Sequence, residues 1–518
     1  MADQPISPAT SVETSPGALA PPIGGGGTGG AGGANSDAPP AATRAVGAPV
    51  SGWGGEVPHK GLILAVACLA QLMVVLDVSI VNVALPSIRD SLHYSATGLQ
   101  WVVNAYVLTF AGFLMLGGRI GDLIGRRRIF LLGLLLFTAA SLLGGLAQNA
   151  AWLTTARAVQ GLGGAVLSPA TLSIVMTTFT EGEARNRALG TWSAVAGAGG
   201  AIGSLAGGVL TSELGWRWVL YVNVPIGIVG LLVGLRVLPK IAGNRSTRLD
   251  LPGAITVTLG LAVAVYGIVN TATYSWGSAH TIGALAIAAV LLAAFAIIQT
   301  RSAAPLMPFA LFKSRSVSGA NLSMVGVGAA FFSFWYFTSL YMQNALHYDA
   351  LKAGLAFFPM GVAIVIGAQA SSRLLKRTGL RPMILFGLIV TVAGLAWISR
   401  ITPHTTFLWG VCGPGCLVAL GFGLILPPQA ASATNGVPIH QAGLASGLLN
   451  TSRQIGGSIG LAVLATIATS RIDALSKGHT PTAAALTSGF ARAFVVAAFF
   501  GCAAVVASFL IPGRRATR

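Results

Sequence analysis

The chain has 518 residues, of which 54% are hydrophobic and only 8% are charged, whereas an average soluble domain has roughly 25% charged residues. A soluble fold is therefore excluded. The net charge of +18 would suggest nucleic-acid binding in a soluble protein, but basic loops beside membrane spans account for it, and no nucleic-acid partner is expected. No G-x-x-x-x-G-K-[ST] phosphate loop is present, which excludes ATP as an energy source within this chain.

The first 57 residues are rich in Gly, Pro, Ala and Ser and include the run Gly24 to Gly27. Such a composition cannot bury a core, so residues 1–57 are predicted to form a disordered N-terminal tail. The segment lacks a basic start followed by an apolar run, so we expect no cleaved signal peptide. The first transmembrane helix is instead expected to act as an uncleaved signal.

Apolar stretches long enough to cross a bilayer, about 20 residues each, recur from residue 61 onward. Continuous apolar runs favour helices over a barrel, so the sequence predicts an all-α polytopic membrane protein with fourteen transmembrane helices. The expected spans are residues 61–84, 98–117, 129–147, 153–176, 187–209, 217–238, 251–271, 280–299, 319–342, 353–372, 382–399, 407–428, 444–468 and 489–511.

The distribution of basic residues predicts the orientation of these spans. An even number of spans places both termini on one side, and the loops on that side carry most of the Lys and Arg between the spans. The opposite loops carry only Arg89, Arg217, Lys352, Arg400, Arg471, Lys477 and Arg492. Because basic loops stay inside the cell, both termini are predicted to be cytoplasmic.

Two loops share one spacing of four and then three residues. Its positions are Gly118, Asp122 and Gly125 after the second span, and Ser372, Lys376 and Gly379 after the tenth. The repetition predicts two six-helix bundles, residues 58–240 and 317–512, as in carriers built from parallel repeats. Residues 241–316 are then an inserted transmembrane hairpin with its flanking loops, and residues 513–518 a short cytoplasmic tail.

The segment from Gly118 to Arg128, GRIGDLIGRRR, resembles motif A of the major facilitator superfamily in both residues and position. Further similar segments are Leu76 to Pro86, Arg157 to Gly164, Trp216 to Gly227, and Arg453 to Gly457. With fourteen spans, they resemble the fourteen-helix drug:proton antiporter family of multidrug efflux transporters. The resemblance implies the superfamily fold, two six-helix bundles plus an inserted hairpin, working by alternating access.

Asp77 is the only acid well inside a predicted span. A lone carboxyl in hydrocarbon is costly when charged, which makes Asp77 the leading candidate for taking up and releasing a proton. At about 1.5 Å per residue, Asp77 lies roughly 12 Å and Arg157 roughly 7 Å from the outer ends of their helices, so the arginine side chain can reach the carboxylate. The alternative is a static buried ion pair that joins two helices.

One group of residues is predicted to serve the conformational change. Gly118, Asp122, Gly125, Arg126 and Arg127 lie at a short turn, where a charged network can latch one arrangement of the helices. The alternative is a topology signal, which explains the arginines but not Asp122 or the spaced glycines.

In the fifth span, Gly199, Gly203, Gly207 and Gly208 form small-residue stripes that let other helices approach closely. These residues resemble the antiporter motif of exporters, but this chain has Ser204 where the motif has proline. The alternative is ordinary helix packing.

The substrate cavity is expected to be apolar with few polar groups, as suits an amphipathic organic molecule. Six residues are its candidates: Gln71, Asn82, Asn104, Tyr106, Gln160 and Arg453. The aromatic residues between Phe331 and Phe337 surround all sides of their helix, so we expect lipid contact for most and cavity contact for a minority.

We therefore expect a monomeric, multi-pass cell-membrane protein that exports amphipathic organic compounds such as antibiotics, driven by inward proton flow. A proton-coupled carrier of a specific metabolite or siderophore on the same fold is the alternative. A membrane-embedded enzyme is disfavoured because no acids or histidines cluster at midplane. The expected partners are the small-molecule substrate, protons and the lipid bilayer, with no metal and no cofactor besides the proton gradient.

Overall fold

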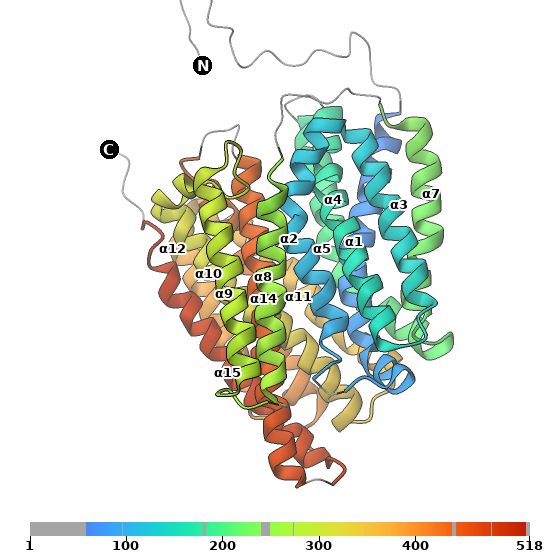
Figure 1. The fold of residues 1–518 in the computed structure, drawn as a ribbon, viewed down its shortest axis with the longest axis vertical. Coiled ribbons are helices and arrows are strands. Elements are labelled where there is room, and N and C mark those ends of the chain that lie inside the picture. Colours follow the sequence, from blue (N-terminus) through green and yellow to red (C-terminus); the bar gives the residue numbers. More distant parts are fainter. Residues whose placement is uncertain are drawn as a thin grey trace, which may run out of the picture. The chain divides into compact units, whose positions relative to one another are not determined.

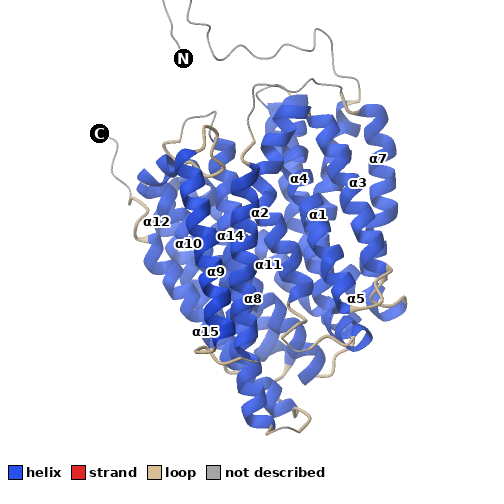
Figure 2. Ribbon diagram, viewed as in Figure 1, coloured by secondary structure: helices blue, strands red, loops and turns tan. Residues whose placement is uncertain are grey.

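The computed structural model describes residues 59–95, 97–179, 183–239, 249–272, 274–437, 442–477 and 479–513. These residues form helices joined by short connections, without a strand in the described ranges (Figure 2). The helices belong to one compact unit, residues 55–518. The tail expected over residues 1–57 lies outside the described residues, as does the C-terminal tail after Gly513.

The first half of the chain forms the first bundle, on the right in Figure 1. Its helices are α1 (Lys60–Leu92), α2 (Trp101–Ile124), α3 (Arg126–Gly145), α4 (Ala150–Thr178), α5 (Glu183–Glu213), α6 (Trp218–Tyr221) and α7 (Asn223–Val237). Within it, α1 packs along α5, and α4 packs against both α2 and α3.

The second half forms the second bundle, reached through a hairpin. The hairpin helices are α8 (Leu251–Val269) and α9 (Ala279–Arg301), with a 3-10 turn, η1 (Asn270–Ala272), between them and another, η2 (Phe309–Lys313), after them. The bundle contains α10 (Arg315–Leu340), a π turn η3 (Tyr341–Ala345), α11 (Ala350–Thr378), α12 (Leu380–Ile398), a π turn η4 (Leu408–Cys412), α13 (Gly413–Thr434), α14 (Ala442–Ser476) and α15 (Ala483–Ser508).

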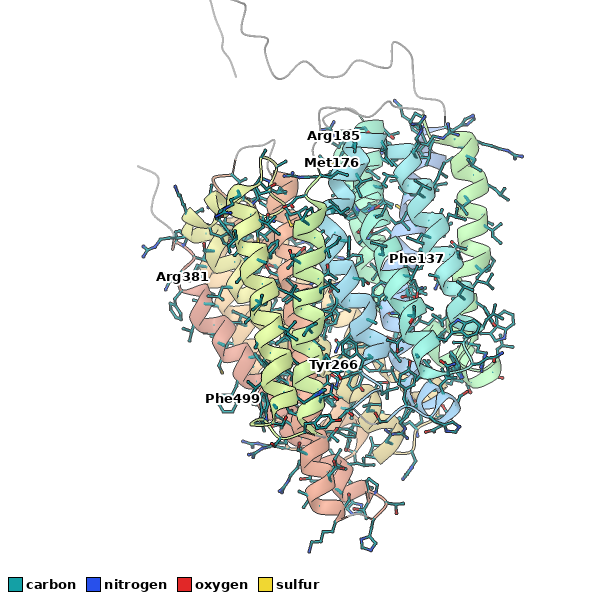
Figure 3. All side chains as sticks on the ribbon, viewed as in Figure 1. Phe137, Met176, Arg185, Tyr266, Arg381 and Phe499 are labelled. Atoms are coloured by element: carbon teal, nitrogen blue, oxygen red, sulfur yellow. The ribbon has the colours of Figure 1, made fainter. Side chains whose placement is uncertain are left out.

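The helical content confirms the expected all-α membrane fold. Thirteen helical segments in the described residues are long and apolar enough to cross a membrane, and α5, a further helix of 31 residues, brings the helices of spanning length to fourteen. Large apolar side chains also remain on the outside, such as Phe499 on α15 (Figure 3), as expected of a surface that faces lipid.

The hairpin covers one seam between the bundles. Helix α8 packs against α2 of the first bundle and α14 of the second, where Thr258 lies directly against Gly112 and Thr466 donates a hydrogen bond to the carbonyl of Ile268 (3.2 Å). Helix α9 lies outside α8, with most of its surface exposed. A hairpin inserted between two repeats thus packs against both of them at once.

The two loops with the repeated spacing have the same backbone geometry. Gly125 ends α2 and precedes α3 with φ 98°, and Gly379 ends α11 and precedes α12 with φ 87°. Side chains other than glycine rarely adopt such angles, so a glycine lets one helix turn directly into the next. The two loops with the repeated spacing therefore share one type of helix-to-helix turn.

The opposite seam is formed by α5 and α11. A Cβ atom on Gly208 of α5 would lie 2.7 Å from the carbonyl oxygen of Ala350, and one on Gly354 of α11 would lie 2.5 Å from the carbonyl oxygen of Ser204. The small-residue face around Gly208 therefore contacts the other bundle. Gly199, Gly203 and Gly207 instead lie against α1, so the two faces of α5 serve different contacts.

Candidate functional site

A cavity of about 1930 Å³ lies between the two bundles. Its wall includes Asn82 on α1 and extends to Arg126, at the start of α3, and Arg373, near the end of α11. Met176 and Arg185, which also line it, lie toward the upper end in the view of Figure 3, the end at which α1 begins. The cavity therefore extends toward the end of the bundles that the basic loops predict to be cytoplasmic.

Four of the six residues proposed for the cavity line it: Gln71, Asn82, Tyr106 and Arg453. Gln160 is buried elsewhere, beside the Asp77 carboxylate. Asn104 is also fully buried, with its amide 3.5 Å from the side-chain oxygen of Gln100, and it does not line the cavity. Both lie on predicted spans, but the faces they occupy point into the first bundle.

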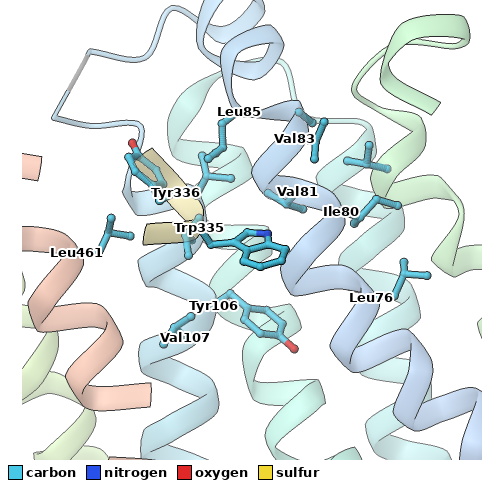
Figure 4. Close-up of a cluster of buried hydrophobic side chains, with 14 of the residues drawn as sticks. Leu76, Ile80, Val81, Val83, Leu85, Tyr106, Val107, Trp335, Tyr336 and Leu461 are labelled. Atoms are coloured by element: carbon cyan, nitrogen blue, oxygen red, sulfur yellow. The ribbon is translucent and has the colours of Figure 1, made fainter. Parts of the chain in front are cut away.

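The expectation that most aromatic side chains of α10 contact lipid is wrong. Phe334, Trp335, Tyr336 and Phe337 are buried in the protein, because α10 is surrounded by α13, α14 and α15 of its own bundle and contacts α1 of the other. Trp335 also lines the cavity and lies close to Tyr106 in Figure 4. The neighbouring Phe331 stacks on Phe422 across the cavity wall, with ring centroids 3.7 Å apart.

Asp77 and Arg157 form a buried ion pair. Arg157 Nη1 lies 2.5 Å from Asp77 Oδ2, and the two side chains are 2% and 0% exposed respectively. Arg157 Nε also donates to the carbonyl of Val102 on α2 (3.0 Å). Desolvating two charges is costly, and the extra hydrogen bonds offset part of that cost.

Neutral polar side chains complete the site around the Asp77 carboxylate. Gln160 Nε2 donates to Asp77 Oδ1 (2.7 Å) and Asn223 Nδ2 donates to the same oxygen (3.2 Å). Both amides also donate to the Ser141 hydroxyl, at 2.9 Å and 3.0 Å. The ionised carboxylate thus has a charged donor and two neutral ones, which stabilise its charge in the absence of water.

Sequence reasoning did not select Ser141 or Asn223 as site residues. Asn223 carried a signal, since it is a polar residue near the start of an otherwise apolar span and within one of the family-like segments. Ser141 carried none, because serine is common in membrane helices and its role depends on where α3 meets α4 and α7.

Tyr106 lies between the ion pair and the cavity. Its ring forms part of the cavity wall, and the Arg157 guanidinium lies over the ring, 4.4 Å from its centroid. Asp77 and Arg157 do not line the cavity themselves. A bound molecule would therefore touch the ring that packs on the cation and could affect the ion pair without contacting it.

The end of the bundles opposite Arg126 and Arg373 is closed by hydrogen bonds between α10 and α1. Pro86 lacks an N–H group, which leaves the carbonyl of Asn82 without its partner in α1. Ser339 of α10 donates to this carbonyl (2.8 Å), and Gln343 in the π turn donates to the carbonyl of Val83 (2.9 Å). A proline inside α1 thus creates the acceptor for a contact between the bundles.

The residues proposed as a latch lie at the entrance of the cavity and beside it. Arg126 and Gly118 line the cavity, whereas Arg127 donates to the carbonyl of Leu235 in the last turn of α7. The Asp122 side chain is outside the described residues, so the latch stays a prediction. The neighbouring Arg119, which was not selected, donates to the carbonyls of Ala304 and Pro305 (2.5 and 2.7 Å) and so connects α2 to the segment after α9.

We expect Arg157→Ala to move the pH dependence of transport to higher pH. Without the guanidinium, the Asp77 carboxylate loses its charged donor and keeps only the neutral donors Gln160 and Asn223, so its ionised form is less stable. Arg157→Lys keeps a cation, but its single ammonium nitrogen cannot replace all the nitrogen donors of the guanidinium. This variant should therefore retain part of the activity and of the normal pH dependence. Initial transport rates of purified protein in liposomes across the neutral pH range are the measurement. An unchanged profile in both variants would show that the two residues are not coupled.

Comparisons with known proteins agree with this geometry. The sequence profile described as Major Facilitator Superfamily matches residues 67–461. The chain is 44% identical over 456 residues to the cephamycin export protein of Amycolatopsis lactamdurans, covering 87% of this chain and 92% of that one. It is 40% identical over 470 residues to the puromycin resistance protein of Streptomyces alboniger, covering 89% and 93% of the two chains.

Solved structures show the same fold at low sequence identity. A bacterial homologue of the human lysosomal transporter Spinster, in an inward-facing and unoccupied conformation, matches with a TM-score of 0.61 and 16% identity, over 88% of this chain and 98% of that chain. A peptide transporter in complex with sulfate matches equally well, over 87% and 96%.

Two helical bundles around a central cavity, with a buried ion pair beside it, define a multi-pass membrane transport protein. The chain belongs to the Major Facilitator Superfamily.

Proposed function

We propose that the protein exports amphipathic organic compounds, including antibiotics, across the cell membrane in exchange for protons. The proton gradient is its energy source, it has no cofactor, it acts as a monomer, and both termini are cytoplasmic. The names of the relatives support the export of antibiotic-like molecules. The observation that carries the proposal is the arrangement of the Asp77–Arg157 pair, which lies behind the Tyr106 ring and outside the cavity.

In this mechanism Asp77 takes up a proton when the cavity faces the outside and loses it when the cavity faces the cytoplasm. Protonation removes the carboxylate that Arg157, Gln160 and Asn223 hold, so the contacts between α1, α4 and α7 weaken. Substrate that presses on the Tyr106 ring shifts Arg157 relative to Asp77 and favours proton release. Proton and substrate therefore bind in alternation, as exchange requires.

Inside-out membrane vesicles test both the direction of transport and its coupling. We expect vesicles with an acidified interior to accumulate the neutral dye N-phenyl-1-naphthylamine, and we expect nigericin, which dissipates the pH gradient, to abolish this accumulation. The dye should also release protons from the vesicles in proportion to its uptake. Vesicles without the transporter are the control. Accumulation driven by the opposite gradient would instead identify a proton-coupled importer.

A further inference from the structure

In the described residues, the cavity wall contains positive but no negative side chains. Among its described lining residues there is no Asp or Glu, whereas five arginines line it: Arg119, Arg126, Arg185, Arg373 and Arg453. The basic loops of the cytoplasmic side explain the four that lie near the ends of their helices. They do not explain Arg453.

Arg453 lies far from either end of its helix. It is eleven residues beyond Ala442, the first residue of α14, which corresponds to about 17 Å along the helix axis. It also lies level with the middle of α10, since a Cβ atom on Gly328 would lie 2.9 Å from the Arg453 carbonyl carbon. A cation at this depth is costly and marks a functional site in membrane proteins.

Arg453, which is partly buried, lacks the partners that the buried Arg157 has. Arg157 has the Asp77 carboxylate, two further oxygen acceptors and the Tyr106 ring. Arg453 donates only from Nη2 to Asn450 Oδ1 (2.6 Å), and its enclosed Nε has no hydrogen-bond partner in the described residues. No described acid lies within ion-pair distance of it. No acid among the described residues therefore compensates its positive charge.

The surroundings of Arg453 are apolar and aromatic on one side and neutral and polar on the other. Phe331, Phe332 and Trp335 of α10 contribute to the cavity wall, and Phe332 lies against Gly457, one turn after Arg453. The adjacent Gln454 has a side-chain oxygen without a partner in the described residues. An organic molecule that fills this cavity displaces the water that solvates the guanidinium, so it must supply a negative charge or leave the cation desolvated.

We propose that the cavity selects amphipathic anions, binding a carboxylate or sulfonate at Arg453 and the apolar body against the aromatic side chains of α10. This inference rests on the proposed export function and adds the charge class of its substrates. A guanidinium has several fixed N–H donors and pairs two of them with one acidic group. Cations of the same size and shape meet only positive charge in the described wall and are poor ligands.

Two dyes with the same aromatic body but different charge distinguish the effect of charge on binding from the effect of shape. 1-Anilinonaphthalene-8-sulfonate is N-phenyl-1-naphthylamine with an added sulfonate, so one is an anion and the other is neutral. Binding to purified protein in lipid nanodiscs is followed by energy transfer from tryptophan, with Trp335 in the cavity wall, after subtraction of the signal from empty nanodiscs. We expect the wild-type protein to bind the anion more tightly than the neutral dye.

We expect Arg453→Gln to weaken binding of the anion by about tenfold or more and to change binding of the neutral dye by less than about twofold. Arg453→Lys should fall between Arg453→Gln and the wild type. Arg492→Gln, which removes an exposed arginine of α15 outside the cavity, should bind both dyes normally. The neutral dye reports whether each variant still has a folded cavity.

Three outcomes of the binding experiment would overturn the inference: equal loss of binding of both dyes in Arg453→Gln, no loss of binding of either dye, or tighter binding of the neutral dye than of the anion by the wild type. If Arg453→Gln does not fold, the wild-type preference and Arg453→Lys still decide the question. Vesicles that export the neutral dye but not the anion would contradict this inference and leave the proposed function intact. Vesicles that export neither would contradict the proposed function.

Discussion

Asp77→Asn is expected to reduce proton-coupled export to the level of vesicles without the transporter. The amide fills the same space and still accepts hydrogen bonds from Gln160 and Asn223, but it cannot ionise, so no proton is carried back through the protein. Substrate-induced proton release by purified protein is the measurement. Exchange of substrate across the membrane without a gradient should persist, because binding in the cavity does not use Asp77 directly.

Two controls separate the loss of a proton site from the loss of a structural ion pair. Asp77→Asn leaves Arg157 buried without its anion, which is destabilising by about 3–5 kcal/mol for buried pairs in soluble proteins. The double variant Asp77→Asn with Arg157→Gln removes both charges, so it should be more stable but equally uncoupled. Asp250→Asn changes the other buried acid in the described residues, at the start of α8, where Gln299 donates to it (2.6 Å). It should leave coupling intact. Normal coupling in the double variant would show that Asp77 is not the proton site.

Gly208→Leu is expected to abolish transport by holding the two bundles apart at the end opposite Arg126. A Cβ atom at this position would lie 2.7 Å from the Ala350 carbonyl oxygen and 3.2 Å from the Gly354 Cα atom, both in the other bundle. Backbone atoms cannot move aside as a flexible side chain can, and adding atoms to a closely packed contact destabilises it by about 1–3 kcal/mol. Because alternating access requires this end to close, the cavity should remain accessible from that side.

A cysteine at the closed end measures the opening directly. Ser339 is fully buried, so Ser339→Cys in a chain whose four native cysteines are replaced should react slowly with a membrane-impermeant maleimide added outside intact cells. Adding Gly208→Leu should make the reaction at least about tenfold faster. Gly283→Leu on α9, where a Cβ atom meets nothing within 4 Å, is the matched control and should change neither labelling nor transport. Transport at the normal rate in the Gly208→Leu variant would contradict the proposed closure.

The residue pattern was sufficient to predict the membrane fold and one ionised pair. Every helix that crosses the bilayer needs an apolar stretch of about 20 residues, and such stretches can be recognised in the sequence without knowing any tertiary contact. Asp77 stood out because a charge in a span is rare, and Arg157 was a cation at a depth from which its long side chain can reach the carboxylate. Gly125 and Gly379 were visible as a repeat, since a one-residue turn with positive φ needs glycine.

The sequence by itself thus determined the spans, the repeated loop spacing and the acid at the centre of the first bundle, while the orientation that the charges indicate stays a prediction. Only the tertiary structure decided which face of each helix meets protein, cavity or lipid. Most aromatic side chains of α10 were predicted to face lipid, but Phe334, Trp335, Tyr336 and Phe337 are buried because four other helices surround them. Gln160 and Arg453 were both predicted to line the cavity, but only Arg453 does so, and Gln160 binds the Asp77 carboxylate instead. Apolar side chains suit lipid and protein interiors alike, so hydrophobicity cannot tell one from the other, and only the packing of helices distant in sequence assigns each face its neighbour.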